Sequence, residues 1–433
     1  MLLVAARPAA RNRALLAAAA PALRRSYAAA TGPSDTGFST ATATGVAIAA
    51  KDQPGAIGTL SFVIKAGSRY STTPGIAHAL ERFAFQNTMS RSALRVTRES
   101  EYLGATFAPA LSRDTIVLTA DFLKEDLPYF FEVLSDVFAR PHLARHELAE
   151  IVAPLLKLDS TAVTKDIVAS VSEALHAAAF RRGLGLPLYA QPADSISATN
   201  VSAYKEAVYT KSNLAIVSAG IPLDSLVPLT QDFLEGAPAG TATAVEPAPF
   251  YAGESRVPST IGNAIAIGYG GASAPEYAVL ASILGGTSSL KWSTGTSLLA
   301  GTKAISTYTP YAGSGLFSII ASAGSVADTT TAASTAISAL KSVASDLSAE
   351  DLKKGVAGAK FAALSSLDGK VGLSTAGLSL LTTGAVPTAA ATISLYDAVT
   401  AEKVKAAAAA VLAKPAYAVA GKVSELPYIE ELL

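Results

Sequence analysis

The sequence contains no cysteine among its 433 residues. This absence excludes disulfide bonds, thiolate-ligated zinc, iron–sulfur clusters and a cysteine nucleophile. The charges are balanced, with 34 basic and 34 acidic residues, so no basic excess indicates binding to nucleic acid. No segment reaches the roughly 18 consecutive apolar residues that favour a membrane-spanning helix. Any association with a membrane is therefore expected to depend on partner proteins.

Acidic residues are also missing from the N-terminal segment. Five arginines, from Arg7 to Arg25, are interspersed there with alanine and leucine. Such an acid-poor, potentially amphipathic segment is typical of a mitochondrial presequence, and a disordered alanine-rich tail is the alternative. The Arg-Ser-Tyr-Ala run at residues 25–28 resembles a presequence cleavage pattern. We therefore expect residues 1–27 to be removed, so that the mature chain begins near Ala28.

Strand and helix signals occur in two similar successions along the chain. Residues 38–233 carry the first and residues 259–433 the second, at a shift of roughly 200 residues that is typical of duplicated domains. Residues 234–258 are rich in Gly, Pro, Ala and Thr and lack an apolar period, which predicts a linker. Because strand runs are grouped with helix runs, we expect two homologous α+β domains.

The first strand and helix of each succession illustrate this pattern. Gly58–Ser71 is a β-branched and aromatic run that predicts a strand leaving into a loop. A helix is expected directly afterwards, with Thr72 or Thr73 as its cap. The corresponding pair in the second succession is a strand over Asn263–Gly271 and a helix over Ala274–Gly286.

The run HALER places His78, Glu81 and Arg82 at positions i, i+3 and i+4. This spacing is that of the H-x-x-E-H motif, in which two histidines bind zinc and the glutamate activates a water molecule. A helix would put the three side chains on one face, as the motif requires. Arg82 stands where the second histidine belongs, and a guanidinium has no lone pair to offer a cation.

A second near-match, HLARHELAE, begins at His142. His142 and His146 would chelate a metal if both were on one helix face, but the motif fails at Arg145 in one reading and at Glu150 in the other. An exposed polar helix face is the alternative interpretation of these residues. The sequence contains neither a P-loop nor a completed G-x-S-x-G elbow.

With the degenerate motif, the duplicated α+β unit and the presequence, the chain resembles the mitochondrial processing peptidase branch of the pitrilysin-like metallopeptidases. The resemblance runs from Phe38 to Leu433, and the segments Tyr102–Pro141 and Pro187–Gly220 carry it in the first half. It implies two domains, each a mostly antiparallel sheet with helices packed on it, arranged as a clamshell around a cavity.

The resemblance also implies where a third zinc ligand would lie. In this family a glutamate roughly 75 residues downstream of the motif completes the site. Leu158 falls at that position, and Asp159 beside it would require a shift of register. With Arg82 and Leu158 at two of the three ligand positions, we expect no catalytic, metal-binding or cofactor-binding residues.

Two further segments resemble the core-two branch of this family, which belongs to respiratory complex III (ubiquinol–cytochrome c reductase). They are Leu284–Leu299, with its Lys-Trp-Ser step at residues 291–293, and the ending Gly421–Leu433. The α subunit of the processing peptidase would have a long glycine-rich loop at the first segment. Here Gly285, Gly286 and Gly295 are spread too widely for such a loop.

This likeness implies a non-catalytic structural subunit, peripheral on the matrix side of the mitochondrial inner membrane. The expected partners are a homologue of core subunit one and other subunits, including cytochrome b and cytochrome c1, within a dimeric complex. No cofactor is expected in this chain. Two alternatives remain open: the substrate-binding α subunit of the processing peptidase, and an active zinc metallopeptidase.

Overall fold

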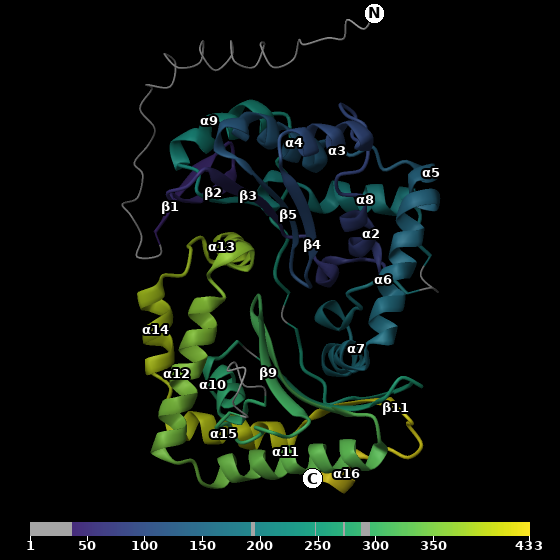
Figure 1. Ribbon diagram of the computed structural model, residues 1–433, viewed down its shortest axis with the longest axis vertical. Helices are drawn as coiled ribbons and strands as arrows, with labels where there is room; N and C mark the ends of the chain where they lie inside the picture. Colours follow the sequence, from purple (N-terminus) through teal and green to yellow (C-terminus); the bar gives the residue numbers. More distant parts are fainter. Residues whose placement is uncertain (1–36, 192–194, 247, 272, 287–294) are drawn as a thin grey trace, which may run out of the picture.

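The computed structural model describes residues 37–191, 195–246, 248–271, 273–286 and 295–433 (Figure 1). The expected presequence, residues 1–27, lies outside the described residues. The same is true of the Lys-Trp-Ser step at residues 291–293.

The first half of the chain forms a six-stranded sheet with the order β1-β2-β6-β3-β5-β4. Neighbouring strands are antiparallel except β2 and β6, which are parallel. The strands are β1 (Phe38–Ala43), β2 (Val46–Lys51), β3 (Ile57–Ile64), β4 (Thr106–Leu111), β5 (Ile116–Leu123) and β6 (Leu214–Ala219). The central strand β6 is a nearly continuous apolar run, which suits its burial on both faces of the sheet, whereas the largely buried β3 also contains Thr59 and Ser61.

Helices cover one face of this sheet, where Phe62 of β3 packs edge-on against Phe131 and Phe138. The longer helices are α2 (Ile76–Arg82), α3 (Ala93–Tyr102), α4 (Leu127–Ala139), α6 (Ala153–Lys165), α7 (Ile167–Phe180), α8 (Ala198–Val208) and α9 (Leu223–Leu234). The short elements are η2 (Ser68–Tyr70), η3 (Lys124–Asp126), α5 (Arg145–Glu147), the π-helical turn η4 (Leu148–Val152), η5 (Gly183–Gly185) and η6 (Lys211–Asn213).

The second half forms a five-stranded sheet with the order β7-β11-β8-β10-β9. Its strands are antiparallel except for the pair β7 and β11. They are β7 (Glu254–Pro258), β8 (Asn263–Gly271), β9 (Ala304–Tyr311), β10 (Ser314–Ala323) and β11 (Ala416–Gly421). The accompanying helices are α10 (Pro275–Leu284), α11 (Val326–Ser345), α12 (Ala349–Ser365), α13 (Gly369–Thr383), α14 (Ala389–Asp397), α15 (Ala401–Ala413) and α16 (Ile429–Leu432).

Strand β7 differs from the sequence-based expectation, because Glu254–Pro258 was predicted as the end of the linker. The strand is short, lies at the sheet edge and contains two charged residues and a proline, so its sequence resembles a loop. Contacts far along the chain hold it in place. The Arg256 guanidinium donates to the carbonyls of Val423 at 2.9 Å and Leu426 at 2.6 Å, and it lies over the Tyr428 ring.

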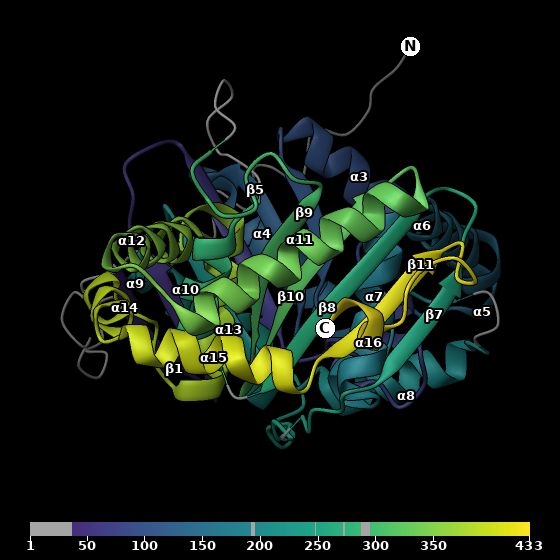
Figure 2. The ribbon, with the colours of Figure 1, turned by 90° about the horizontal axis from the view of Figure 1, so that it is seen from below.

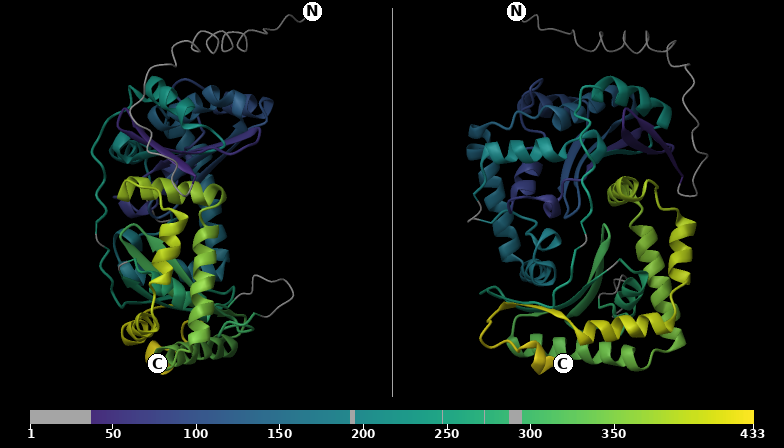
Figure 3. Two further views of the ribbon diagram at one scale, coloured as in Figure 1. Left: turned by 90° about the vertical axis from the view of Figure 1, so that its left-hand side faces the viewer. Right: turned by 180° about the vertical axis from the view of Figure 1, so that it is seen from behind.

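Each half of the chain contributes one helix that packs on the sheet of the other half. Helix α7, from the first half, packs on the second sheet through Val171, Leu175 and Phe180, a contact visible from below in Figure 2. Helix α13, from the second half, packs on the open face of the first sheet through Leu373, Ala376 and Leu380 (Figure 3). Each sheet is therefore covered on one face by its own helices and on the other by a helix of the opposite half.

The prediction of an α+β fold with two units, each a mostly antiparallel sheet with helices packed on it, is confirmed. Among the described residues, no helix combines the length and the apolar character needed to cross a bilayer.

Candidate functional site

The degenerate motif lies on α2, which begins later than the sequence suggested. Gly75 is the N-cap residue, and no side chain caps the helix, so the predicted cap at Thr72 or Thr73 is wrong. Gly75 has φ +77°, a left-handed conformation that glycine adopts without a steric cost. This turn lies between Pro74 and the helix and moves the first helical residue to Ile76.

The motif side chains lie together on the inner face of α2. His78 and Glu81 are buried, whereas the Arg82 side chain is 31% exposed. Across from them, α6 contributes Asp159. Its Oδ2 accepts a hydrogen bond from Arg82 Nε at 2.7 Å and lies 3.0 Å from His78 Nε2. Glu81 Oε2 lies 3.4 Å from the same Arg82 nitrogen.

The residue that reaches this cluster from α6 is Asp159, whereas its neighbour Leu158 is 65% exposed. The π-helical turn η4 directly precedes α6 and contains one residue more per turn than an α-helix. The sequence-based alignment, which placed Leu158 at the third ligand position, gives no sign of this turn. The structure thus brings His78, Glu81 and Arg82 together with Asp159, and it leaves Leu158 outside the cluster.

The hydrogen bonds assign the tautomer of His78. Its Nδ1 accepts a bond from the backbone N–H of Ala190 at 3.1 Å, so this nitrogen carries no proton. The proton of the neutral ring is therefore on Nε2, which donates to Asp159. The ring of Tyr189 packs edge-on against the imidazole at 5.1 Å. Burial lowers the pKa of His78 and raises that of Glu81, so burial favours the neutral form of both.

These residues do not fit a zinc ion. A catalytic zinc site requires three protein ligands and an open position for water. Here ligation through Nε2 of His78 would place a proton on Nδ1, facing the N–H of Ala190, and Arg82 brings a positive charge to the position of a ligand. Within the described parts of the chain, no three His, Asp or Glu side chains are grouped so that they could hold a metal ion.

The second near-match is not on one helix. His142 precedes Leu143, whose φ of +47° separates it from the short helix α5 that contains His146. His142 Nδ1 lies 3.8 Å from Glu147 Oε1, and both histidines are exposed. The i, i+4 spacing therefore does not produce a chelating pair on one helix face.

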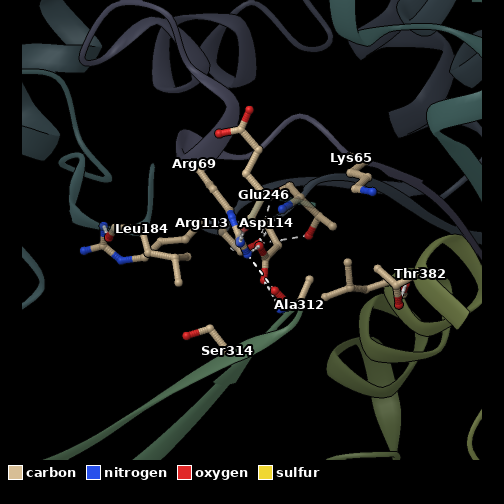
Figure 4. Close-up of polar contacts among 12 residues, drawn as sticks. Lys65, Arg69, Arg113, Asp114, Leu184, Glu246, Ala312, Ser314 and Thr382 are labelled. Carbon is tan, nitrogen blue, oxygen red and sulfur yellow. Dashed lines mark hydrogen bonds and ion pairs between the residues drawn. The ribbon is translucent and has the colours of Figure 1, made fainter. Parts of the chain in front are cut away.

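A second polar cluster, which the sequence did not predict, joins the two halves (Figure 4). Arg69 follows β3 and Asp114 precedes β5, and the side chains pair at 3.2 Å with only 4% of each exposed. The backbone of Ala312, at the tip of the β9–β10 hairpin, bonds both side chains. Ala312 donates its N–H to Asp114 Oδ2 at 2.9 Å and accepts from Arg69 Nη1 at 2.7 Å, while Arg69 Nη2 donates to the carbonyl of Glu246.

Helix α7 and the η5 turn after it add further polar contacts to this junction. Arg113 bonds Glu173 at 2.6 Å and the carbonyl of Leu184 at 3.0 Å. His176 Nε2 lies 2.7 Å from the Tyr311 hydroxyl, and its Nδ1 donates to the carbonyl of Ser172. Burial lowers the pKa of His176 to about 3, so the ring is neutral at physiological pH. The three residues that bond one another across the two halves, Arg69, Asp114 and Ala312, are called the interdomain bolt below.

Comparison with protein families assigns two successive parts of the chain to two domains of one peptidase family. Residues 46–191 match the model of Insulinase (Peptidase family M16), and residues 195–358 match that of the Peptidase M16 inactive domain.

Among similar proteins, the mitochondrial cytochrome b-c1 complex subunit 2 of Neurospora crassa is 38% identical over 96% of this chain and 95% of its own length. The same subunit of Schizosaccharomyces pombe is 35% identical over 90% of this chain and 93% of its own. The α subunit of the mitochondrial processing peptidase of Solanum tuberosum is 29% identical, over 49% of this chain and 43% of its own length. The chain therefore belongs to the M16 peptidase family.

Proposed function

We propose that this chain is a non-catalytic structural subunit of respiratory complex III, the cytochrome b-c1 complex. The observation that carries this proposal is Arg82, whose guanidinium lies among His78, Glu81 and Asp159, where a peptidase would hold its metal. The similarity to complex subunits over nearly the whole of both chains supports the assignment to this assembly.

The site lacks the means to hydrolyse a peptide bond. Activation of water at neutral pH in this family's chemistry depends on a bound metal ion that lowers the pKa of the water. Burial raises the pKa of the Glu81 carboxyl, which suits a general base. A general base alone does not activate water enough for peptide hydrolysis in this kind of chemistry, because the metal ion is what makes the water acidic. The fixed charge of Arg82 also opposes the approach of a divalent cation.

The role that remains is assembly. We propose that the chain pairs with a homologue of core subunit one and docks on the cytochrome b and cytochrome c1 part of a dimeric complex. It lies peripherally on the matrix side of the mitochondrial inner membrane after removal of its presequence. Obligate interfaces of this kind bury roughly 2,000 Å² or more. The chain itself carries no haem, iron–sulfur cluster or quinone.

Native electrophoresis of gently solubilised mitochondria tests this proposal. The chain is probed in the gel, and b- and c-type haem absorbance is read in the same band. We expect the chain to migrate with the haem-bearing band, and we expect that band to be lost when the chain is depleted. A haem-free band of lower mass would refute the proposal and favour the substrate-binding α subunit of the processing peptidase, to which half of the chain is similar.

A zinc measurement on the purified chain separates the remaining alternative. Stoichiometric zinc that survives dialysis, together with hydrolysis of a presequence peptide, would identify an active metallopeptidase. We expect neither.

A further inference from the structure

We propose that Arg82, Asp159 and His78 form a metal-free clamp, in which the guanidinium replaces a metal ion as the cation that joins α2 to α6. The inference rests on the non-catalytic part of the proposed function. It is independent of the complex in which the chain assembles.

The clamp connects three segments that are distant in sequence. Arg82 and His78 come from α2, and both contact one oxygen of Asp159 on α6, at 2.7 Å and 3.0 Å. The backbone N–H of Ala190 holds the opposite nitrogen of His78 at 3.1 Å. A zinc ion bound by side chains of α2 and α6 would connect the same two helices.

Helix α6 continues from η4 and also contacts α7, but it buries few of its own side chains. Leu156 is its only fully buried residue, and most of its other side chains face solvent. Its apolar packing is therefore small for a helix of 13 residues. The polar contacts of Asp159 thus make a large contribution to the attachment of α6, and the partial burial of Asp159 and Arg82, at 24% and 31% exposed, limits their screening by water.

The direction of the hydrogen bonds at His78 shows that the site is adapted to the absence of a metal. A histidine that ligates a metal donates its other ring N–H to an acceptor. His78 does the reverse, because its Nδ1 accepts from the N–H of Ala190 and its Nε2–H faces Asp159. Binding zinc through Nε2 would require the proton to move to Nδ1, where it would oppose the N–H of Ala190.

Arginine suits this structural role because it keeps its charge throughout the physiological pH range. The planar guanidinium also directs its Nε–H at Asp159. A clamp of this kind is formed by the chain alone and does not depend on metal supply.

Hydrogen–deuterium exchange of the full-length chain tests the clamp. We expect Arg82→Met to accelerate exchange of the α6 amides about tenfold, while the strands of the first sheet keep their protection. Arg95→Met is the matched control. It removes an exposed i, i+4 ion pair with Glu99 and should change exchange in α6 by less than about twofold. Unchanged exchange of α6 in Arg82→Met would refute the clamp.

Zinc titration tests the locked orientation of His78. Because ligation through Nε2 would set an Nδ1–H of His78 against the N–H of Ala190, Arg82→His alone should not create a site, and zinc should not slow α6 exchange in this variant. Slower α6 exchange in Arg82→His on adding zinc would show that His78 is free to ligate and would overturn this part of the inference. Zinc protection of the wild-type chain would instead refute the proposed non-catalytic function, so the two failures are distinguishable.

Discussion

The interdomain bolt should be among the most sensitive points of the molecule to substitution. Arg69→Met removes one partner of an ion pair whose side chains are each 4% exposed, so solvent screens little of the effect. Asp114 then stays buried with the N–H of Ala312 as its remaining bonded partner. Breaking a buried pair from one side costs about 3–5 kcal/mol. Since Asp114 retains that bond, we expect a loss of about 3 kcal/mol.

Urea unfolding of the purified chain, followed by circular dichroism, measures this loss as a shift of the midpoint. Adding Asp114→Asn to Arg69→Met should restore part of the stability, because the neutral amide oxygen still accepts from Ala312 and leaves no buried charge. We expect a coupling energy of about 1–3 kcal/mol between the two substitutions. The exposed control Arg95→Met should cost about 0.5 kcal/mol or less.

The same prediction has a geometric readout. The chain has no native cysteine, so cysteines introduced at Glu101 on α3 and Thr335 on α11 would be the only labelling sites. Spin labels there should give a narrow distance distribution in the wild-type background and a broader one with Arg69→Met. If Arg69→Met costs no more than the exposed control and leaves the distribution narrow, the hairpin tip does not hold the two halves together.

Three other predictions concern a tightly packed glycine and two buried histidines. Gly67→Ala should destabilise the chain severely, because a Cβ atom there would lie 2.2 Å from the carbonyl oxygen of Arg113; Gly236→Ala, with open space around it, should be nearly neutral in the same thermal melt. His176 has a pKa of about 3 in the folded chain and about 6.5 when unfolded, so the unfolded state binds its proton first as the pH falls. Stability should therefore drop through this window by up to about 1.4 kcal/mol per pH unit from this group, and His176→Gln should show a shallower fall in denaturation at pH 4 to 6. In ¹⁵N-histidine spectra at neutral pH, His78 should show the Nε2–H tautomer and His176 the Nδ1–H tautomer; a shared tautomer would contradict the assigned hydrogen bonds.

Sequence patterns predicted the regular elements well where one apolar period dominated. The strand over Asn263–Gly271 and the helix that ends before Gly285 are found as expected, because continuous apolar runs and a glycine stop are local signals. The cap of α2 was wrong, because threonine is a common cap and the choice of Gly75 depends on backbone geometry. Strand β7 was missed for a related reason: its partner β11 lies far along the chain.

The candidate site was predictable in its residues on α2 and less so beyond that helix. His78, Glu81 and Arg82 share a helix, so their spacing alone places them on one face. The contribution of Asp159 depends on how α6 packs against α2, and this packing has no local sequence signal. Arg69 and Asp114 also escaped prediction, because they meet only when the ends of two neighbouring strands and a hairpin of the other half come together.

Helices α7 and α13, which pack on the sheet of the opposite half, also constrain the order in which the molecule can fold. The last strand of the first sheet, β6, ends at Ala219, but the helix that covers its open face, α13, begins at Gly369. If the chain folds in order from its N-terminus, Val63 and Val217 lack their cover until roughly 150 residues beyond β6 have become available. During that interval the first half carries an uncovered apolar sheet face, which is the kind of surface that aggregates or is held by chaperones. The first half therefore cannot reach its final packing until most of the second half is available.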